Sequence, residues 1–187
     1  TQTSDGGFAI SGYANISNSF KAFLYKTDAN GDVLWSKIYP GNGKSWAYGM
    51  AQTSDGGYII VGTTNNINGG TLLFTIKTDA FGDTLWTKMY GGGGIEKEGY
   101  GVSQTSDGGF VVTGRTTDAT GLNWSACAIK IGPMGTLISG YQLPLAPKQK
   151  KLVQRFDLLG RVISNPQPQQ VYIELYDDGS TAKVIWQ

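Results

Sequence analysis

Apolar and polar residues alternate along most of this chain in short runs that glycine-containing turns separate. One series of four runs covers residues 48–53, 58–62, 72–77 and 84–90. Alternation with a period of two is typical of β-strands with one buried face, whereas the second run is apolar on both faces, as in a strand covered on two sides. The pattern predicts four short antiparallel strands joined by hairpins.

Three copies of this series follow one another. The sequence Gln-Thr-Ser-Asp-Gly-Gly, followed by an aromatic residue, stands at residues 2–8, 52–58 and 104–110, so that it recurs after 50 and then after 52 residues. A period of this size in strand-like sequence predicts the blades of a β-propeller, with an open β-solenoid or a tandem sandwich as the alternative. Each Asp-Gly-Gly lies between two apolar runs, where glycine supplies the positive φ that a tight turn needs. The turn residues to which we assign a structural role are Asp5, Gly6, Gly7, Asp55, Gly56, Gly57, Asp107, Gly108 and Gly109.

Each of the first two copies also carries a tryptophan in its last run. Trp35 and Trp86 stand nine residues after Lys26 and Lys77, which end the third run of their copies. We expect both indoles to be structural wedges between neighbouring blades rather than ligand platforms. The third copy has Ser139 in this place and Gly-Pro-Met-Gly instead of an acidic turn. The terminal repeat of an array often differs from the other repeats in this way.

These patterns predict an all-β chain. Residues 1–143 would form about three four-stranded blades of a partial propeller, with periods that start near residues 7, 57 and 109. Three blades leave two apolar faces uncovered, and residue 1 already lies inside a repeat. We therefore expect the chain to be a fragment of a longer protein with a ring of roughly six to eight blades.

The composition argues against several kinds of site. The chain of 187 residues has 28 glycines, 10 tyrosines and 5 tryptophans but no histidine, which removes the commonest general base and the commonest zinc ligand. The 15 basic and 14 acidic residues nearly balance, so no net field favours nucleic acid, and no run is long and apolar enough for a membrane helix. The single cysteine, Cys127, lies in an alternating run and is expected to be a buried thiol. We predict no cofactor.

The acidic turns of the repeat favour structure over metal binding. Residues 28–32, Asp-Ala-Asn-Gly-Asp, are similar to a calcium loop, with oxygen-bearing side chains at alternate positions. However, Phe81 takes the place of Asn30 in the second copy, and the third copy has no acid there. A hairpin turn with Asx hydrogen bonds explains the same residues, so we predict no metal site.

Few acidic residues stand outside the repeated positions. Within the three copies, the acidic residues outside the repeated positions are Glu96, Glu98 and Asp118. We expect Glu96 and Glu98 to form ion pairs with Lys97 in a solvated, glycine-rich loop. Catalysis of glycoside hydrolysis needs a pair of carboxylates in an asymmetric arrangement. We therefore predict no catalytic residue, and no enzyme, in these copies.

The composition changes at Pro144. A solvated linker is expected at residues 144–151, which contain two prolines and a basic run, and a separate tail at residues 152–187. In the tail the pattern predicts strands at 152–156 and 171–176, then a turn at 177–180 and a returning strand at 183–186.

Both parts of the chain resemble known families. Asp-Gly-Gly-aromatic, followed by Lys-Thr-Asp-x-x-Gly-Asp-x-Leu-Trp, resembles the β-propeller repeats of large bacterial exported and cell-surface proteins. The tail resembles the small β-hairpin or β-sandwich-like C-terminal sorting domain that the type IX secretion machinery of Bacteroidetes-type bacteria reads. The Asn-Pro motif that many members carry upstream is missing, and a β-rich cap on the last blade is the alternative. The residues that carry this second resemblance are Asp157, Leu159, Gly160, Arg161, Tyr172, Tyr176, Asp178, Gly179 and Lys183.

The two resemblances imply a secreted or outer-membrane cell-surface protein. Its role would be binding, adhesion or scaffolding, and its partners would be the type IX secretion machinery and a glycan or protein ligand. The alternative is an exported hydrolase or lyase that acts on polysaccharide, with its catalytic residues N-terminal to residue 1.

Overall fold

The computed structural model describes most of the chain, and the described residues form 14 β-strands and no helix. The described ranges are 1–41, 43–66, 69–92, 95–118, 120–142, 152–165, 167–168, 170–176 and 181–185. They belong to two compact units, Thr1–Pro144 (unit 1) and Leu145–Gln187 (unit 2). The prediction of an all-β chain is confirmed. Within the described ranges no helix could cross a membrane.

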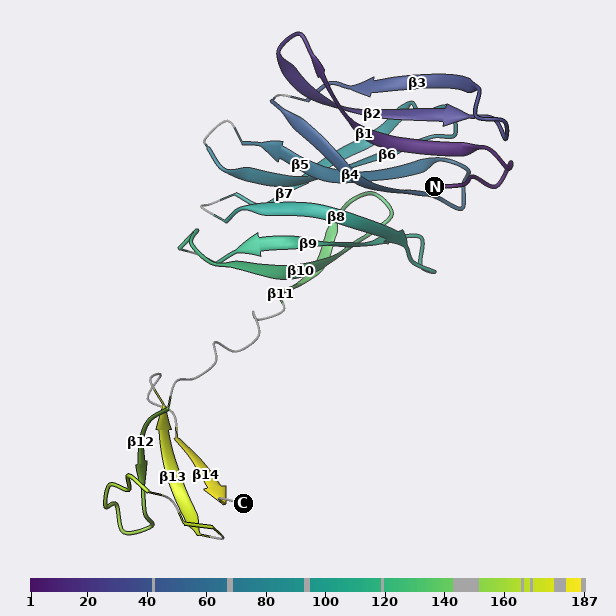
Figure 1. Ribbon diagram of the computed structural model, residues 1–187. Coiled ribbons are helices and arrows are strands. Elements are labelled where there is room, and N and C mark those ends of the chain that lie inside the picture. Colours follow the sequence, from purple (N-terminus) through teal and green to yellow (C-terminus); the bar gives the residue numbers. More distant parts are fainter. Residues whose placement is uncertain are drawn as a thin grey trace. The chain divides into compact units, whose positions relative to one another are not determined.

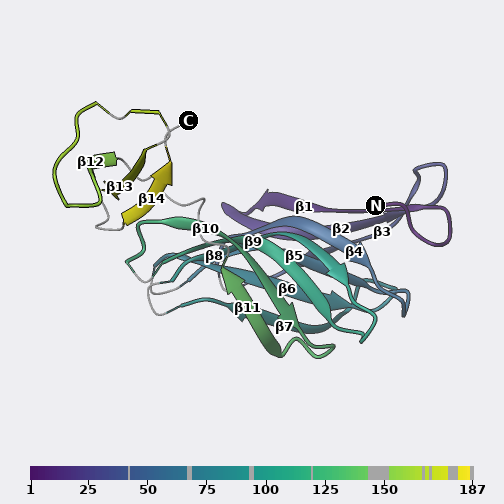
Figure 2. The same ribbon diagram turned by 90° about the horizontal axis from the view of Figure 1, so that it is seen from below.

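Unit 1 contains three antiparallel sheets that follow one another in the order of the sequence (Figures 1 and 2). Sheet 1 has the strand order β1-β2-β3, sheet 2 the order β4-β5-β6-β7, and sheet 3 the order β8-β9-β10-β11. The strands are β1 (Phe8–Ile16), β2 (Ser19–Thr27), β3 (Val33–Tyr39), β4 (Ser45–Gln52), β5 (Tyr58–Asn65), β6 (Thr71–Thr78), β7 (Thr84–Tyr90), β8 (Lys97–Gln104), β9 (Phe110–Thr117), β10 (Trp124–Ile131) and β11 (Leu137–Gln142).

Sheets 2 and 3 each contain the four strands that the sequence pattern predicts for one copy. β7 coincides with the predicted run 84–90. β4 begins three residues before the predicted run 48–53, because Ser45 and Trp46 also pair with β5. Sheet 1 has three described strands rather than four, and residues 1–7 form the turn before β1.

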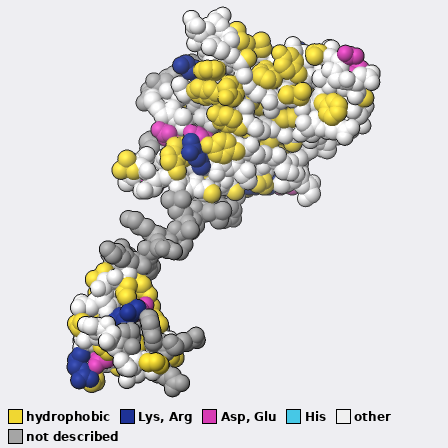
Figure 3. Space-filling view, viewed as in Figure 1, with side chains coloured by type: hydrophobic (Ala, Val, Ile, Leu, Met, Phe, Trp, Pro, Cys, Tyr) yellow, Lys and Arg dark blue, Asp and Glu magenta, His cyan; other side chains and the backbone are white. Residues whose placement is uncertain are grey.

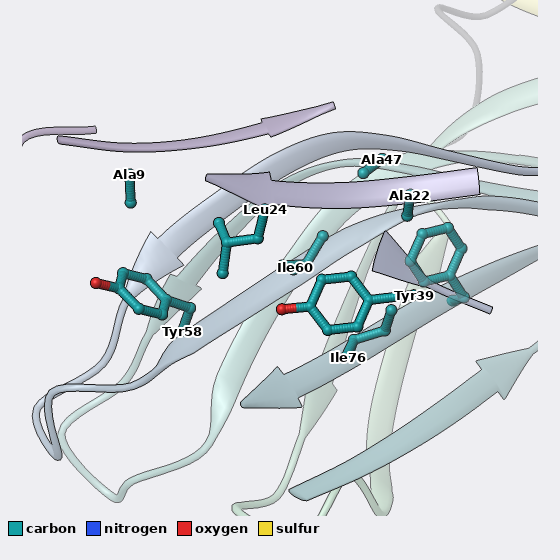
Figure 4. Packing of buried hydrophobic residues seen from close by; sticks show 9 residues of the cluster. Ala9, Ala22, Leu24, Tyr39, Ala47, Tyr58, Ile60 and Ile76 are labelled. Carbon is teal, nitrogen blue, oxygen red and sulfur yellow. The ribbon is translucent and has the colours of Figure 1, made fainter. Parts of the chain in front are cut away.

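Two apolar clusters join the sheets face to face. The first contains Ala9, Ala22, Leu24 and Tyr39 from sheet 1 and Ala47, Tyr58, Ile60, Phe74 and Ile76 from sheet 2 (Figure 4). The second contains Ile59, Val61, Leu73 and Tyr90 from sheet 2 and Phe110, Val112, Ile129 and Ile131 from sheet 3. Because side chains alternate along a strand, Ile59 and Ile60 enter different clusters. β5 is therefore buried on both faces, as its apolar run predicts.

The Asp-Gly-Gly turn has the same construction in each copy. In the second copy Asp55 Oδ1 accepts hydrogen bonds from Thr53 Oγ1 (2.5 Å) and from the backbone N–H of Gly57 (3.0 Å), and Gly56 has φ +81°. Lys77, near the end of β6, places its Nζ 2.8 Å from Asp55 Oδ2. The equivalent pairs Lys26–Asp5 and Lys130–Asp107 lie at the same distance.

Unit 2 contains one antiparallel sheet with the order β12 (Leu152–Phe156), β13 (Val171–Tyr176) and β14 (Thr181–Ile185). The first two strands coincide with the predicted ones. The returning strand begins at Thr181, two residues earlier than predicted. The predicted linker 144–151 and the predicted turn 177–180 lie outside the described residues.

Candidate functional site

A row of aromatic side chains crosses unit 1 from sheet 1 to sheet 3. Its ring centroids are spaced 5.8 Å from Phe20 to Tyr13, 6.2 Å from Tyr13 to Tyr48 and 5.6 Å from Tyr48 to Tyr100. Figure 3 shows hydrophobic side chains gathered on this face of unit 1, over β1, β4 and β8. We use the term aromatic row for Tyr13, Phe20, Trp46, Tyr48, Tyr100 and Trp124, together with Arg115.

The two central tyrosines reach this surface because each stands at a β-bulge. The pairing register shifts after Ala47 in β4 and after Gly99 in β8, so that Tyr48 and Tyr100 have no partner in the ladder. A bulge bends its strand and re-aims the side chain. A Cβ added to Gly49 would lie 2.4 Å from the backbone oxygen of Tyr100, so the glycine lets the two strands approach. As a result Tyr48 and Tyr100 lie side by side and are 46% and 42% exposed.

The row ends in a charged group on sheet 3. The guanidinium carbon of Arg115 lies 4.1 Å from the ring centroid of Trp124, within the range of a cation–π interaction. Arg115 Nε also donates a hydrogen bond of 2.8 Å to Glu98 Oε2, to which the Tyr100 hydroxyl donates as well. Burial acts to raise the pKa of Glu98, but the hydrogen bonds from Arg115 and Tyr100 hold it below the usual value. Glu98 is therefore an ionised acceptor at neutral pH and is unsuited to be a general acid.

This arrangement corrects the interpretation of the glycine-rich loop. The expected ion pair of Glu98 with Lys97 in a solvated loop is wrong, because both residues belong to β8. The side chain of Glu98 is 14% exposed and pairs with Arg115 of β9. Lys97 Nζ instead donates a hydrogen bond of 3.2 Å to Thr116 Oγ1.

Tyr48 and Tyr100 are equivalent, but other members of the aromatic row differ from sheet to sheet. Tyr13, Thr63 and Arg115 occupy equivalent places, each five residues after the aromatic residue of the repeat. Trp46 pairs with Thr63 in sheet 2, and Glu98 pairs with Arg115 in sheet 3. Sheets 1 and 3 thus add Tyr13 and Arg115 to the row at this place, whereas Thr63 of sheet 2 is buried, and the row runs from aromatic side chains to a charged one.

Chemically, the row combines flat apolar faces with polar tips. Tyrosine and tryptophan offer ring faces for stacking while the hydroxyl or indole N–H stays available for hydrogen bonds. A few polar groups among apolar ones are what fixes the orientation of a bound small ligand. The row therefore suits a ligand that is itself apolar on its faces and rich in hydroxyl groups on its rim.

The repeated tryptophans lie between neighbouring sheets. The Trp35 ring is 6.0 Å from that of Tyr58, and the Trp86 ring is 6.2 Å from that of Phe110. Trp86 Nε1 also donates a hydrogen bond of 3.1 Å to the backbone oxygen of Pro133. Both indoles are half-buried at the edges of the two apolar clusters rather than at their centres.

The acidic turns bind their own backbone. Asp28 Oδ1 accepts hydrogen bonds of 2.9 Å from the backbone N–H groups of Asn30 and Asp32. Asp79 Oδ1 accepts equivalent bonds of 2.9 Å from Phe81 and 2.8 Å from Asp83. These are Asx turns. In the part of the chain that the structure describes, His, Cys, Asp and Glu side chains form no group of three or more that could hold a metal ion.

The residues of the tail motif fall into a turn and a sheet. Asp157 Oδ1 accepts hydrogen bonds of 2.9 Å from the backbone N–H groups of Leu159 and Arg161, and Gly160 has φ +79°. Tyr172 is buried in β13, and Tyr176 donates a hydrogen bond of 2.7 Å to Glu174. Lys183 pairs with Ile173 in the β13–β14 ladder. Asp178 and Gly179 lie outside the described residues.

Comparison with known protein families and with curated proteins gives no match to this chain. The aromatic row and the tail are therefore interpreted from their own geometry.

Proposed function

We propose that this chain is part of an exported β-propeller protein that binds carbohydrate along its aromatic row. The observation that carries the proposal is the contiguous set of half-exposed rings, which ends in the Arg115–Glu98 pair. The C–H face of a pyranose ring stacks on an aromatic face, while its hydroxyl groups find donors and acceptors in Tyr, Arg and Glu. Centroid spacings of 5.6–6.2 Å give an extended platform, which suits an oligosaccharide better than a single sugar.

The role is binding rather than catalysis. Glu98 is ionised and held by two hydrogen bonds, so that it can orient a hydroxyl group but has no proton to give to a leaving group. The polar groups beside it are a guanidinium and a tyrosine hydroxyl. Together these groups make a recognition surface.

The propeller architecture is supported by the repetition of one junction between sheets. Tyr39 of sheet 1 donates its hydroxyl hydrogen bond to the backbone oxygen of Gly82 at 3.0 Å, and Tyr90 of sheet 2 does the same to Gly135 at 2.8 Å. When the same junction is repeated, each sheet is related to the next by the same rotation and translation. Such a repeated arrangement forms a ring if the rotations add up to a full turn.

The tail is assigned to sorting by the type IX secretion machinery, and the protein to the cell surface or the medium. The support is the resemblance of its motif together with a compact unit of its own, Leu145–Gln187. A sorting signal has to be read apart from its cargo, which a separate unit permits.

The carbohydrate proposal is tested by titrating the full chain with soluble oligosaccharides of defined linkage and by following heat release and tyrosine fluorescence. We expect Tyr48→Ala and Tyr100→Ala each to weaken binding by about 1–2 kcal/mol, which is roughly fivefold to thirtyfold in Kd. Tyr25→Ala is the matched control, because Tyr25 is 40% exposed but lies outside the row. Equal losses in all three variants, or release of shortened oligosaccharides during the titration, would contradict the proposal.

A further inference from the structure

Sheet 1 carries an apolar face that points away from sheet 2. Ala9 and Leu24 face sheet 2 in the first cluster, so their neighbours along the strands point to the opposite side. We call this side the outer face of sheet 1. It consists of Phe8, Ile10, Phe23 and Tyr25.

The same positions are covered in the next sheet. Their counterparts in sheet 2 are Tyr58, Ile60, Phe74 and Ile76, which sheet 1 covers in the first cluster. Ile60 is 0% exposed, whereas Ile10 is 50% exposed. The outer face of sheet 1 thus has the composition of a surface that receives another sheet.

Four contacts define how one sheet docks on the next, and the junction of sheets 1 and 2 shows all of them. The ring of Trp35 lies against the turn at Gly82, where an added Cβ would come within 2.7 Å of it. Tyr39 donates its hydroxyl hydrogen bond to Gly82 O (3.0 Å), and Lys37 Nζ lies 2.7 Å from Asp83 Oδ1.

The fourth contact joins the hairpin turns of neighbouring copies. The backbone N–H of Ser4 donates a hydrogen bond of 2.8 Å to Gln52 Oε1, and Ser54 does the same to Gln104. In the three polar contacts the earlier sheet donates and the later sheet accepts, and in the remaining contact the earlier sheet supplies the tryptophan. The junction therefore has a direction.

Sheet 1 has the residues that, in sheet 2, receive the contacts from the preceding sheet. Gln2, Gly31 and Asp32 stand where Gln52, Gly82 and Asp83 stand in sheet 2. Gly82 is buried under Trp35, whereas Gly31 is exposed and an added Cβ there would have no described atom within 4 Å.

Sheet 3 lacks the tryptophan, lysine and tyrosine that the last strands of sheets 1 and 2 contribute to the junction with the next sheet. Ser139 pairs with Lys130 where Trp35 and Trp86 pair with Lys26 and Lys77. By the same spacing Tyr141 replaces the lysine, and Leu143 replaces the tyrosine. A second copy of this chain therefore cannot offer sheet 3 to the outer face of sheet 1 with the same contacts.

We propose that the outer face of sheet 1 docks one further repeat unit of the kind seen in sheets 1 and 2, whose last strand supplies Trp, Lys and Tyr in the spacing of β3 and β7. The tryptophan covers Gly31 and packs on Phe8, the lysine pairs with Asp32, and the tyrosine hydroxyl donates to Gly31 O. The same contacts can therefore extend the array on the side of sheet 1. The inference depends neither on carbohydrate binding nor on closure of a ring.

The test adds such a unit to the full chain by placing a copy of residues 1–50 directly before Thr1. The junction then reproduces the natural step after Met50, with Thr1 and Gln2 in place of Ala51 and Gln52. The copy brings its own Trp35, Lys37 and Tyr39, and its residues 45–50 can pair with β1 as a fourth strand. We expect the backbone amides of β1 to exchange with solvent at least about tenfold more slowly than in the parent chain.

A matched control separates docking on the face from pairing at the edge. The control carries Trp35→Ala, Lys37→Gln and Tyr39→Phe in the added copy alone, so the fourth strand is unchanged. The proposal requires a lower urea midpoint for this control than for the extended chain. It also requires Asp32→Asn in the original sheet to lower the midpoint of the extended chain but not that of the parent.

Two results would overturn the proposal. One is an equal urea midpoint and equal amide exchange for the extended chain and its control. The other is self-association of the parent chain in sedimentation that Asp32→Lys abolishes, since the occupant of the outer face would then be a second copy.

Discussion

Lys77 Nζ lies 2.8 Å from Asp55 Oδ2 and also donates a hydrogen bond of 2.8 Å to the backbone oxygen of Thr78. The lysine side chain is 6% exposed, whereas the aspartate side chain is 56% exposed. The ammonium group is thus buried under the Asp-Gly-Gly turn and joins it to the end of β6. The same lysine–aspartate pair in the other two copies makes this contact a repeated support of the hairpin.

Removal of this ammonium group should destabilise unit 1. In a Lys77→Met variant the backbone oxygen of Thr78 and the Asp55 carboxylate lose a charged donor, at a cost of about 1–3 kcal/mol in the free energy of unfolding. Urea unfolding followed by tryptophan fluorescence measures the loss. Lys44→Met, at an exposed position, serves as the control and should stay within about 0.5 kcal/mol of the parent. A Lys77→Met protein as stable as Lys44→Met would contradict this role.

Acid should weaken the same turns. Burial acts to raise the pKa of Asp55, but the hydrogen bonds from Lys77 and Thr53 outweigh it and lower the pKa from 3.8 to about 2. Hydrogen bonds from Lys26 and Lys130 likewise hold the pKa values of Asp5 and Asp107 well below the usual range.

Because these pKa values are lower in the folded state, their stabilising contribution is complete above about pH 4 and is lost as the pH falls towards 2. The urea midpoint should therefore drop steeply in this window. The drop should be shallower in Asp55→Asn, which no longer has this group to protonate. Parallel curves for the two proteins between pH 4 and 2 would show that Asp55 is not involved.

Gly31 and Gly82 lie in equivalent turns, so alanine substitutions at these two positions can distinguish the cost of backbone strain from the cost of a steric clash. Gly31 and Gly82 both have a positive φ, at +94° and +79°, so an alanine at either position costs about 1–2 kcal/mol. Only at Gly82 would the new Cβ meet Trp35, at 2.7 Å. We expect Gly82→Ala to cost about 1–3 kcal/mol more than Gly31→Ala in urea unfolding. Equal losses would mean that the indole moves aside freely.

The tail should direct export without the repeats. Residues 144–187, fused to an unrelated reporter with a signal peptide, are expected to bring the reporter to the surface or the medium of a host with type IX machinery. Asp157→Ala removes the acceptor of the turn at Leu159 and Arg161 and should reduce this export. If the parent protein reaches the surface equally well after deletion of the tail, the tail is a structural cap instead.

The strands and turns of this chain could be predicted because local sequence determines them. The alternating runs 84–90, 152–156 and 171–176 coincide with β7, β12 and β13, and Cys127 is buried as its place in an alternating run predicts. The limits of β4 were missed, since the pairing of Ser45 with Thr64 depends on a partner that the local sequence does not reveal.

The aromatic row could not be predicted from the sequence. Tyr48 and Tyr100 are repeated, but only the bulges bring them to the surface, and a bulge depends on the register between two strands. Tyr13 and Arg115 differ from copy to copy, so a search for repeated residues passes over them. The glycines near Glu98 favour a loop in the sequence, whereas its partner Arg115 lies 17 residues away.

The place shared by Tyr13, Thr63 and Arg115 has a consequence for how this array can change. The contacts that stack the sheets lie in the two apolar clusters and at the turns, as in the bond from Tyr39 to Gly82. At the shared place, the side chains of Tyr13 and Arg115 belong to the aromatic row, whereas Thr63 is buried in sheet 2. On the function proposed above, a substitution of Tyr13 or Arg115 alters the recognition surface while the contacts that stack the sheets are kept. On the function proposed above, duplication of a repeat supplies a further position of this kind while the contacts between the sheets are repeated.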